Sequence, residues 1–212
     1  MTLPSPAPNP PVVELRQYTL HPGRRDDLIT LFERAFVESQ EAAGITLIGL
    51  FRDLDDPDRF VWLRGFTDMD QRRAALTAFY DGPVWAAHRD AANATMIDSD
   101  DVLLLQPHPL PARADRPQTG GDRLLTLTVQ TLDTALDAPA LDHPGVEILA
   151  AWVTNPAQNT FPRLPVREGE RVLVWLTAYA DEAARAAVEA GVSDAGVMQR
   201  LRLAPTGRSG VR

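Results

Sequence analysis

Charged and aromatic residues alternate with aliphatic ones along two segments in the first half of the chain. Residues 12–20 read VVELRQYTL, and residues 60–66 read FVWLRGF. Because alternate side chains of a strand point to the same side, each segment should gather its charged and aromatic residues on one face. Arginine forks among aromatic rings can clamp a carboxylate or polarise a carbonyl group. The candidate binding residues are therefore Glu14, Arg16, Trp62 and Arg64, with Tyr18 as a candidate catalytic residue.

The same residues also fit a purely structural role. An isolated charge buried among aromatic rings is costly, so these charges must be paired or hydrated. A salt-bridge network that fills the space between the elements would meet that requirement without any ligand. Trp62 and Trp175 equally fit ordinary packing rather than stacking on a bound molecule.

A second group of candidate residues follows residues 81–83, where the sequence predicts that one helix ends and another begins. Trp85, His88 and Arg89 are three and four residues apart, which places them on one face of a helix predicted over residues 84–93. If this helix lies as a lid across the mouth of a barrel, His88 could be a general base, or bind an oxyanion together with Arg89. In the alternative, Trp85 packs and His88 caps or pairs at the surface.

One structural unit is used twice. The pattern VWLRGFTD of residues 61–68 recurs as VWLTAYAD in residues 174–181. The periodicities and turn residues of the first half predict the order β-α-β-β-α-β, which is the ferredoxin-like unit. The predicted organisation is a disordered leader, a first repeat, a linker, a degenerate second repeat and a tail: residues 1–11, 12–106, 107–122, 123–205 and 206–212.

The second repeat departs from the first in two places. The segment between Leu132 and Gly145 is too short for a full first helix, and the hairpin between Trp152 and Arg171 is much longer than its counterpart. The second repeat also has no charge at the positions that match the charged face of the first, which are occupied by Thr126, Thr128, Gln130, Trp175, Thr177 and Tyr179.

The bare faces of the two sheets decide the predicted architecture. A ferredoxin-like sheet carries helices on one face, and its other apolar face must be buried. The predicted fold class is therefore α+β, with two ferredoxin-like βαββαβ repeats packed sheet to sheet as a pseudo-dimeric α/β barrel. Val13 and Leu15 suit the helix side of the first strand, so the charged residues are expected inside the barrel. A homodimer that pairs first half with first half is the competing arrangement.

The charge balance and the missing residue types exclude several classes of function. The net charge of −8 argues against a nucleic acid or an anionic membrane as a partner. All 21 basic residues are Arg, which excludes a lysine Schiff base, and the absence of Cys excludes thiol chemistry. No stretch reaches the ~20 apolar residues of a membrane span, and no metal site is predicted. These features favour a cytoplasmic protein with a small-molecule ligand, and homo-oligomerisation stays open.

Several of these segments resemble the NIPSNAP family over residues 12–106. They are ELRQYTL at residues 14–20, followed by Pro22-Gly23, then residues 53–66, and GPVW at residues 82–85 with His88-Arg89. The second half resembles the family only through its repeat pattern and lacks the Trp-x-x-His-Arg segment. The resemblance implies the dimeric α/β-barrel superfamily, which also holds cofactor-free oxygenases, haem-degrading enzymes and stress-response barrels. It carries over no catalytic residues.

Two kinds of function follow from these expectations. The first is a cofactor-independent small-molecule enzyme of oxygenase or isomerase type, with its site inside the barrel of the first repeat and His88 at the rim. The second is a non-catalytic small-ligand-binding or scaffold protein. No cofactor is predicted; haem, which the resemblance brings in, would use His88 as its ligand. The Arg-only composition is typical of a bacterial protein.

Overall fold

The alternating segments of the first half form strands in the order expected of a ferredoxin-like unit. In the computed structural model, β1 pairs with β3 and β4, and β2 pairs with β3, all antiparallel. The predicted first helix is a continuous helical run with a π-helical turn, η1, in its middle. The elements are β1 (Val12–Leu20), α1 (Arg25–Leu31), η1 (Phe32–Phe36), α2 (Val37–Ala42), β2 (Thr46–Asp53), β3 (Arg59–Phe66), α3 (Met69–Tyr80), α4 (Pro83–Asn93) and β4 (Met96–Pro107).

The second half repeats the same sheet with fewer helices. Its strand β5 pairs with β7 and β8, and β6 pairs with β7, again antiparallel. The elements are β5 (Leu124–Thr131), β6 (Val146–Thr154), β7 (Val172–Tyr179), α5 (Glu182–Gly191) and β8 (Val197–Pro205).

The structure describes residues 10–109, 124–132, 146–191 and 195–211. Residues 1–9 of the leader predicted over residues 1–11 therefore lie outside the described residues. The same holds for most of the predicted linker and for the short segment expected in place of a helix after Leu132. In the described part, no helix combines the length and the apolar character needed to cross a membrane.

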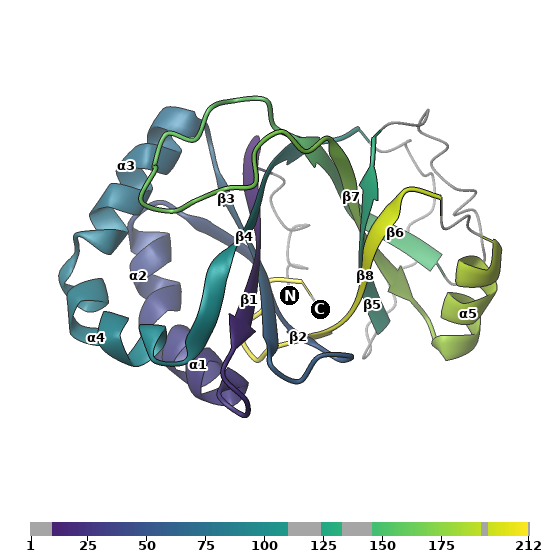
Figure 1. Cartoon of the computed structure of the whole chain (residues 1–212), viewed down its shortest axis with the longest axis horizontal. Helices are drawn as coiled ribbons and strands as arrows, with labels where there is room; N and C mark the ends of the chain where they lie inside the picture. Colours follow the sequence, from purple (N-terminus) through teal and green to yellow (C-terminus); the bar gives the residue numbers. More distant parts are fainter. Residues whose placement is uncertain (1–9, 110–123, 133–145, 192–194, 212) are drawn as a thin grey trace, which may run out of the picture.

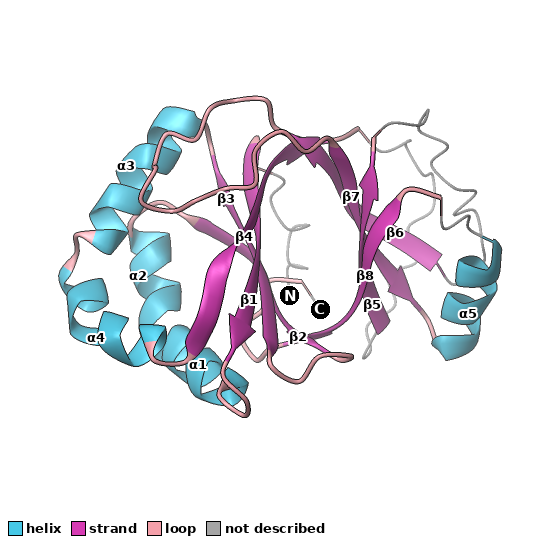
Figure 2. Cartoon of the chain, viewed as in Figure 1, coloured by secondary structure: helices cyan, strands magenta, loops and turns pink. Residues whose placement is uncertain are grey.

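The two sheets close into one eight-stranded barrel within a single chain. The strand order is β1-β3-β2-β8-β5-β7-β6-β4, and the halves are joined by the antiparallel pairs β2–β8 and β4–β6. The described helices all lie outside the barrel, most of them over the first half (Figures 1 and 2). The predicted fold class, two ferredoxin-like repeats that form an α/β barrel, is confirmed.

The barrel interior is apolar, and the predicted orientation of the first strand was wrong. Val13, Leu15, Val61 and Leu63 are fully buried in the cluster that fills the barrel, together with residues of the second half. An eight-stranded barrel has just enough room for its own side chains. Both faces of the sheet are buried, so the alternation separates two sets of residues without showing which set lies inside. The charged set needs polar partners, which the helices supply.

The ends of the described chain pack against this barrel. Pro10 is buried against β3, where a Cβ on Gly65 would lie 1.9 Å from its Cγ atom. At the other end, the backbone amide of Thr206 donates to the carbonyl of Leu50, and Val211 packs against the barrel cluster. Described residues of the predicted leader and tail therefore belong to the packed structure.

A run of turn-forming residues lies inside a strand. Residues 98–101 are all acidic or hydroxyl residues, a composition typical of a turn, yet they belong to β4, which begins at Met96. The pairing of β1 with β4 is irregular here, with register shifts between Gln17 and Leu20. Irregular pairing of this kind lets a strand accommodate residues that otherwise favour turns.

Candidate ligand site: a buried arginine cluster

Strand pairing and helix capping bring four charged residues together between the first sheet and its helices. In the antiparallel pair of β1 and β3, Glu14 lies opposite Arg64. Asp68 caps α3 by accepting a hydrogen bond of 2.7 Å from the backbone amide of Gln71. The next residue, Arg72, is fully buried and reaches Glu14 from the helix side. We call Glu14, Arg16, Arg64 and Arg72 the arginine cluster.

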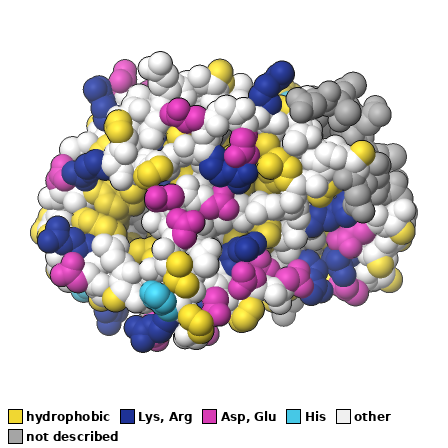
Figure 3. Space-filling view, viewed as in Figure 1, with side chains coloured by type: hydrophobic (Ala, Val, Ile, Leu, Met, Phe, Trp, Pro, Cys, Tyr) yellow, Lys and Arg dark blue, Asp and Glu magenta, His cyan; other side chains and the backbone are white. Residues whose placement is uncertain are grey.

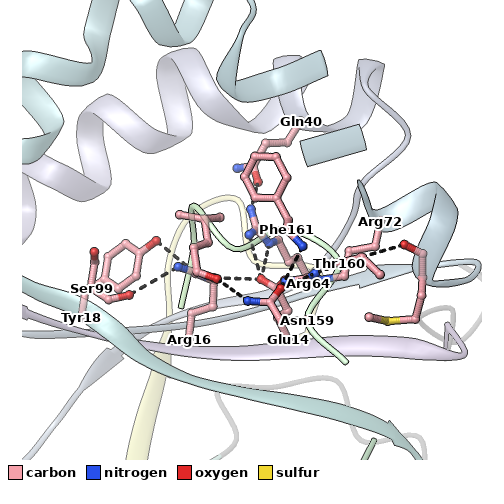
Figure 4. A network of polar contacts seen from close by, with 12 residues as sticks. Glu14, Arg16, Tyr18, Gln40, Arg64, Arg72, Ser99, Asn159, Thr160 and Phe161 are labelled. Carbon is pink, nitrogen blue, oxygen red and sulfur yellow. Dashed lines mark hydrogen bonds and ion pairs between the residues drawn. The ribbon is translucent and has the colours of Figure 1, made fainter. Parts of the chain in front are cut away.

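Glu14 is the centre of the arginine cluster (Figure 4). Its Oε2 atom lies 2.9 Å from Arg16 Nη1 and accepts a hydrogen bond of 2.8 Å from Arg64 Nε. Its Oε1 atom accepts a hydrogen bond of 2.6 Å from Arg72 Nε. None of the four side chains is more than 1% exposed. Buried ion pairs of this kind depend on close geometry, because desolvation opposes the mutual attraction of the charges.

Neutral groups hold the outer ends of the guanidinium groups. Arg64 Nη1 donates to Gln40 Oε1 at 3.3 Å, so α2 contributes to the site. Arg16 Nε donates to the hydroxyl of Tyr18 at 3.2 Å, and Arg16 Nη2 donates to the carbonyl of Ser99 at 3.3 Å. These contacts orient the cations but add no negative charge.

Aromatic rings surround the cluster on the sheet side. The Arg64 guanidinium lies 5.0 Å from the ring centroid of Trp62, and that of Arg16 lies 5.6 Å from the same ring. Tyr18 packs edge-on against Trp62 with ring centroids 5.8 Å apart. Cation–π contacts of this kind stabilise a desolvated guanidinium, although less than an anion does. Figure 4 shows the polar network from close by.

The long hairpin of the second half completes the site. Residues 155–171, which we call the arm, connect β6 to β7 and extend over the first half (Figure 1). Arg72 Nη1 donates to Asn159 Oδ1 at 3.0 Å and to Thr160 Oγ1 at 3.4 Å. Phe161 stacks on Tyr80 with ring centroids 6.0 Å apart. The predicted long hairpin therefore supplies residues to a site in the other repeat.

Two ion pairs fasten the arm to the first half. Arg163 Nη1 lies 2.7 Å from Asp81 Oδ1 at the end of α3, and Arg167 Nη1 lies 2.9 Å from Asp101 Oδ1 in β4. The backbone amide of Arg167 also donates to the carbonyl of Val102. The arm is thus held at both sides of the cluster that it covers.

The arginine cluster carries an excess of positive charge. Three guanidinium groups face a single carboxylate, so the net charge of the four buried side chains is +2. Arg64 Nη2 lies 2.7 Å from Glu14 Oε2 but outside hydrogen-bond geometry, and Arg72 Nη2 donates no hydrogen bond within the described residues. By contrast, acidic side chains are prominent on the outer face of the molecule shown in Figure 3. The buried positive charge therefore contrasts with an acidic protein, whose net charge is −8.

Electrostatics keep Glu14 ionised and Tyr18 protonated. Burial raises the pKa of Glu14, but Arg64, Arg16 and Arg72 together outweigh that effect and leave the pKa well below its usual range. Burial raises the pKa of Tyr18 above its usual value, opposed by Arg16. Burial lowers the pKa of Arg72, opposed by Glu14. A carboxylate this acidic is a poor proton acceptor, so the cluster is suited to binding negative charge rather than to general base catalysis.

The lowered pKa of Glu14 predicts an acid-dependent loss of stability. A carboxyl group whose pKa is lowered in the folded state stabilises the fold above its unfolded pKa of about 4.3 and loses that contribution as the pH falls. We therefore expect the difference in unfolding free energy between the wild type and Glu14→Gln to narrow below about pH 4. Urea unfolding at a series of pH values measures this difference, and a constant difference down to about pH 3 would contradict the prediction.

The second half shows that the fold does not require these charges. In the registers of the two central strand pairs, Trp175 lies opposite Thr128 just as Trp62 lies opposite Arg16. By the same correspondence, Thr126 and Thr177 occupy the places of Glu14 and Arg64. These threonines are buried, as predicted for a matching face without charge on its central strands. The two tryptophans pack on equivalent strands, one in each repeat, while charged residues on the central strand pair occur in the first repeat alone.

The second half keeps an arginine at the place of Arg72 but uses it differently. Asp181 caps α5 as Asp68 caps α3, and Arg185 follows four residues later. Arg185 Nη1 lies 2.7 Å from Glu189 Oε2 of its own helix, and Arg185 also pairs with Glu182. Its charge is thus balanced locally, at the edge of the protein.

The predicted lid helix does not lie across the barrel mouth. α4 packs against α3 and η1 in the outer helix layer, because Trp85 contacts Phe36 and Phe79 there. His88 is partly buried, with its ring 6.3 Å from that of Phe36. Arg89 is exposed and lies 3.5 Å from Asp90. The structure therefore does not bring His88 and Arg89 into the arginine cluster, and Trp85 touches the site only through Tyr80.

Haem and metal ions find little support in the residues present. His88 packs edge-on against Phe36, a residue of the first-half core, so a haem group on His88 would have to displace that core side chain. These residues do not fit an enclosed haem site. Within the described ranges, no three His, Asp or Glu side chains gather in a way that could hold a metal ion.

Several residues of the site were missed by reading the sequence. Arg72 lies on a helix, and its only signal is its place one turn after the capping residue Asp68. Gln40 and Tyr80 lie at helix ends, where the sequence shows no feature that separates them from ordinary helix residues. Asn159, Thr160 and Phe161 belong to a hairpin more than 80 residues away from their partners, as the separations of 87 and 88 residues to Arg72 show.

In comparison with known protein families, the first half of the chain matches a family model. Residues 13–111 match the NIPSNAP family model, so the resemblance of the first half is confirmed. A NIPSNAP family protein from Agrobacterium tumefaciens is 20% identical over 46% of this chain and 92% of its own, with a TM-score of 0.43. An uncharacterised NIPSNAP domain protein from Burkholderia xenovorans is 16% identical over 50% of this chain and 98% of its own, with a TM-score of 0.40.

A further structure is similar over nearly the whole chain. A proposed monooxygenase from Lactobacillus acidophilus is 16% identical over 92% of this chain and 94% of its own, with a TM-score of 0.53. At this level of identity the likeness shows a shared fold and no more. No curated protein matches the chain.

Proposed function

Starting from the NIPSNAP domain in the first half, we propose that the protein binds a small organic anion at the arginine cluster. The site lies between the first sheet and its helices, beneath the arm, instead of inside the barrel. The observation that carries the proposal is the buried net charge of +2 around Glu14. Buried charges without compensation are costly, and the second repeat builds the same strands with threonines. An anion would compensate the charge that Glu14 leaves unbalanced.

The surroundings of the cluster indicate an anion with an aromatic or conjugated body. Trp62, Tyr18, Tyr80 and Phe161 present rings around the guanidinium groups. Ligand sites typically combine an apolar aromatic lining with a few polar groups that fix orientation. The unused donor atom of Arg72 would meet the acidic group, and the rings would cover the rest of the molecule.

Binding of a simple aromatic acid tests this proposal. Benzoate should bind saturably to the wild type at millimolar concentrations, and Arg64→Met should weaken binding by about 10-fold to 100-fold, because one of the three buried cations that attract the anion is lost. Benzamide, which has the same shape without the charge, should bind more weakly than benzoate. Isothermal titration calorimetry measures all three.

Substitution outside the cluster provides the control for this experiment. His88→Ala removes a side chain that packs on Phe36 in the outer helix layer, and benzoate affinity should stay within about twofold of the wild type. Equal affinity for benzoate and benzamide would overturn the proposal. If His88→Ala lost as much benzoate affinity as Arg64→Met, the binding site would lie at α4 instead.

Catalysis without a cofactor is the second candidate function, favoured by Tyr18. Its protonated hydroxyl lies 3.2 Å from Arg16 Nε, so a phenol and a guanidinium could together stabilise an enolate of a bound substrate. Such stabilisation suits oxygenase or isomerase chemistry. Tyr18→Phe should then abolish turnover of an enolisable aromatic acid with little effect on its affinity. Loss of affinity and turnover in parallel would leave Tyr18 with a binding role alone.

A further inference from the structure

The charge count of the arginine cluster and the unpartnered Nη2 atom of Arg72 define the ligand more closely. Arg16, Arg64 and Arg72 contact one carboxylate and otherwise only neutral groups among the described residues: Tyr18, Gln40, Ser99, Asn159 and Thr160. A singly charged ligand would still leave one buried positive charge uncompensated. Two negative charges would bring the buried site to neutrality, which lowers the cost of burial most.

Arg64 and Arg72 reach Glu14 from different elements and are oriented by different neutral groups. Arg64 comes from β3 and is oriented by Gln40 of α2. Arg72 comes from α3 and is oriented by Asn159 and Thr160 of the arm. Arg72 Nη2 has no partner among the described residues, and Arg64 Nη2 lies 2.7 Å from Glu14 Oε2 without hydrogen-bond geometry, although both side chains are fully buried. The donor without a partner therefore belongs to Arg72, on the helix side of Glu14, while Arg64 holds the carboxylate from the strand side.

We infer that the ligand of the arginine cluster is a dianion, with its negative charge shared between Arg64 and Arg72. This inference rests on the proposed anion-binding function and names the charge class of the ligand. A dicarboxylate on a planar body and a phosphomonoester share this chemistry. Arg72 is then the residue that distinguishes a dianion from a monoanion, and the arm, which holds its guanidinium, sets that preference.

A matched pair of ligands separates the charge from the shape. Phthalate carries two negative charges near neutral pH, whereas monomethyl phthalate keeps the ring and carries one. Phthalate should bind the wild type about tenfold more tightly or better, because the second charge gains charge-assisted hydrogen bonds from Arg72. Phenyl phosphate in the same titration shows whether one doubly charged group or two separate carboxylates suit the site better.

A matched pair of variants assigns the preference to Arg72. Arg72→Met should reduce the preference for phthalate over monomethyl phthalate by about tenfold. Arg185→Met, at the equivalent place in the second repeat, should leave the preference unchanged, since Arg185 pairs within its own helix. If Arg72→Met does not fold, the wild-type comparison at rising salt replaces it, because screening should weaken phthalate binding more than monomethyl phthalate binding.

The outcomes distinguish this inference from the function on which it rests. Monomethyl phthalate binding as tightly as phthalate and phenyl phosphate would overturn the dianion and leave the anion site standing. An unchanged preference in Arg72→Met would also overturn it. Failure of all three acids to bind saturably would overturn the proposed function itself.

Discussion

Replacement of Glu14 by Gln should lower the free energy of unfolding by about 3–5 kcal/mol. The substitution keeps the size and polarity of the side chain but removes the anion on which three buried guanidinium groups converge. Their mutual repulsion would then be uncompensated in a site that is closed to solvent. Chemical denaturation with urea measures the loss as a shift of the midpoint.

The equivalent position of the second repeat provides the control. Thr126→Val replaces a buried hydroxyl group that has no hydrogen-bond partner among the described residues by a methyl group of similar size, so the unfolding free energy should stay within about 1 kcal/mol of the wild type. Similar losses in the two variants would mean that Glu14 is an ordinary buried polar residue. Added phthalate should also stabilise Glu14→Gln, since an external anion would replace part of the missing charge.

Replacement of the whole cluster should cost less stability than Glu14→Gln and should abolish ligand binding. In the fourfold variant Glu14→Leu, Arg16→Met, Arg64→Met and Arg72→Met, the cluster has no buried charge left. Exchange of a complete buried ion cluster for apolar residues of similar volume is often neutral or stabilising. We expect unfolding free energy within about 2 kcal/mol of the wild type and no saturable binding of phthalate.

These two readouts separate a structural cluster from a functional one. Calorimetric titration and urea unfolding of the same fourfold variant provide them. A variant that folds but still binds phthalate with wild-type affinity would place the ligand elsewhere in the molecule. A variant less stable than Glu14→Gln would show that the ion network itself, independent of any ligand, holds the helices on the sheet.

The sequence predicted the repeat and the barrel because both depend on local patterns. The recurrence of Val61-Trp62-Leu63 as Val174-Trp175-Leu176 reports equivalent central strands, and two such sheets in one chain are enough to close a barrel. The alternation along the first strand also correctly predicted that Glu14, Arg16 and Tyr18 share one face of the strand and that their neighbours lie on the other face. These are properties of a strand and its nearest partner, which a single sequence records.

The location of the charged face could not be predicted from the same pattern. Glu14 and Val13 are both fully buried. A rule that places apolar residues inside and polar residues outside therefore cannot predict which of the two side chains faces the barrel interior. The choice is made by partners that come from elsewhere in the chain, above all Arg72 from α3 and the arm. The same limitation explains why His88 was wrongly predicted to lie on a lid over the barrel mouth. Helix periodicity identifies a face of the helix but not the element against which that face packs.

The barrel that closes within one chain also has a consequence for how its binding properties can change. In a barrel assembled from two identical subunits, every substitution appears twice, so a residue suited to a ligand pocket must also be tolerated at its symmetry mate. Here the covalent connection removes that constraint. One half can carry the buried ionic groups, while the other half has uncharged residues on the equivalent strands and contributes the loop that covers the site. Substitutions can therefore change these two roles independently.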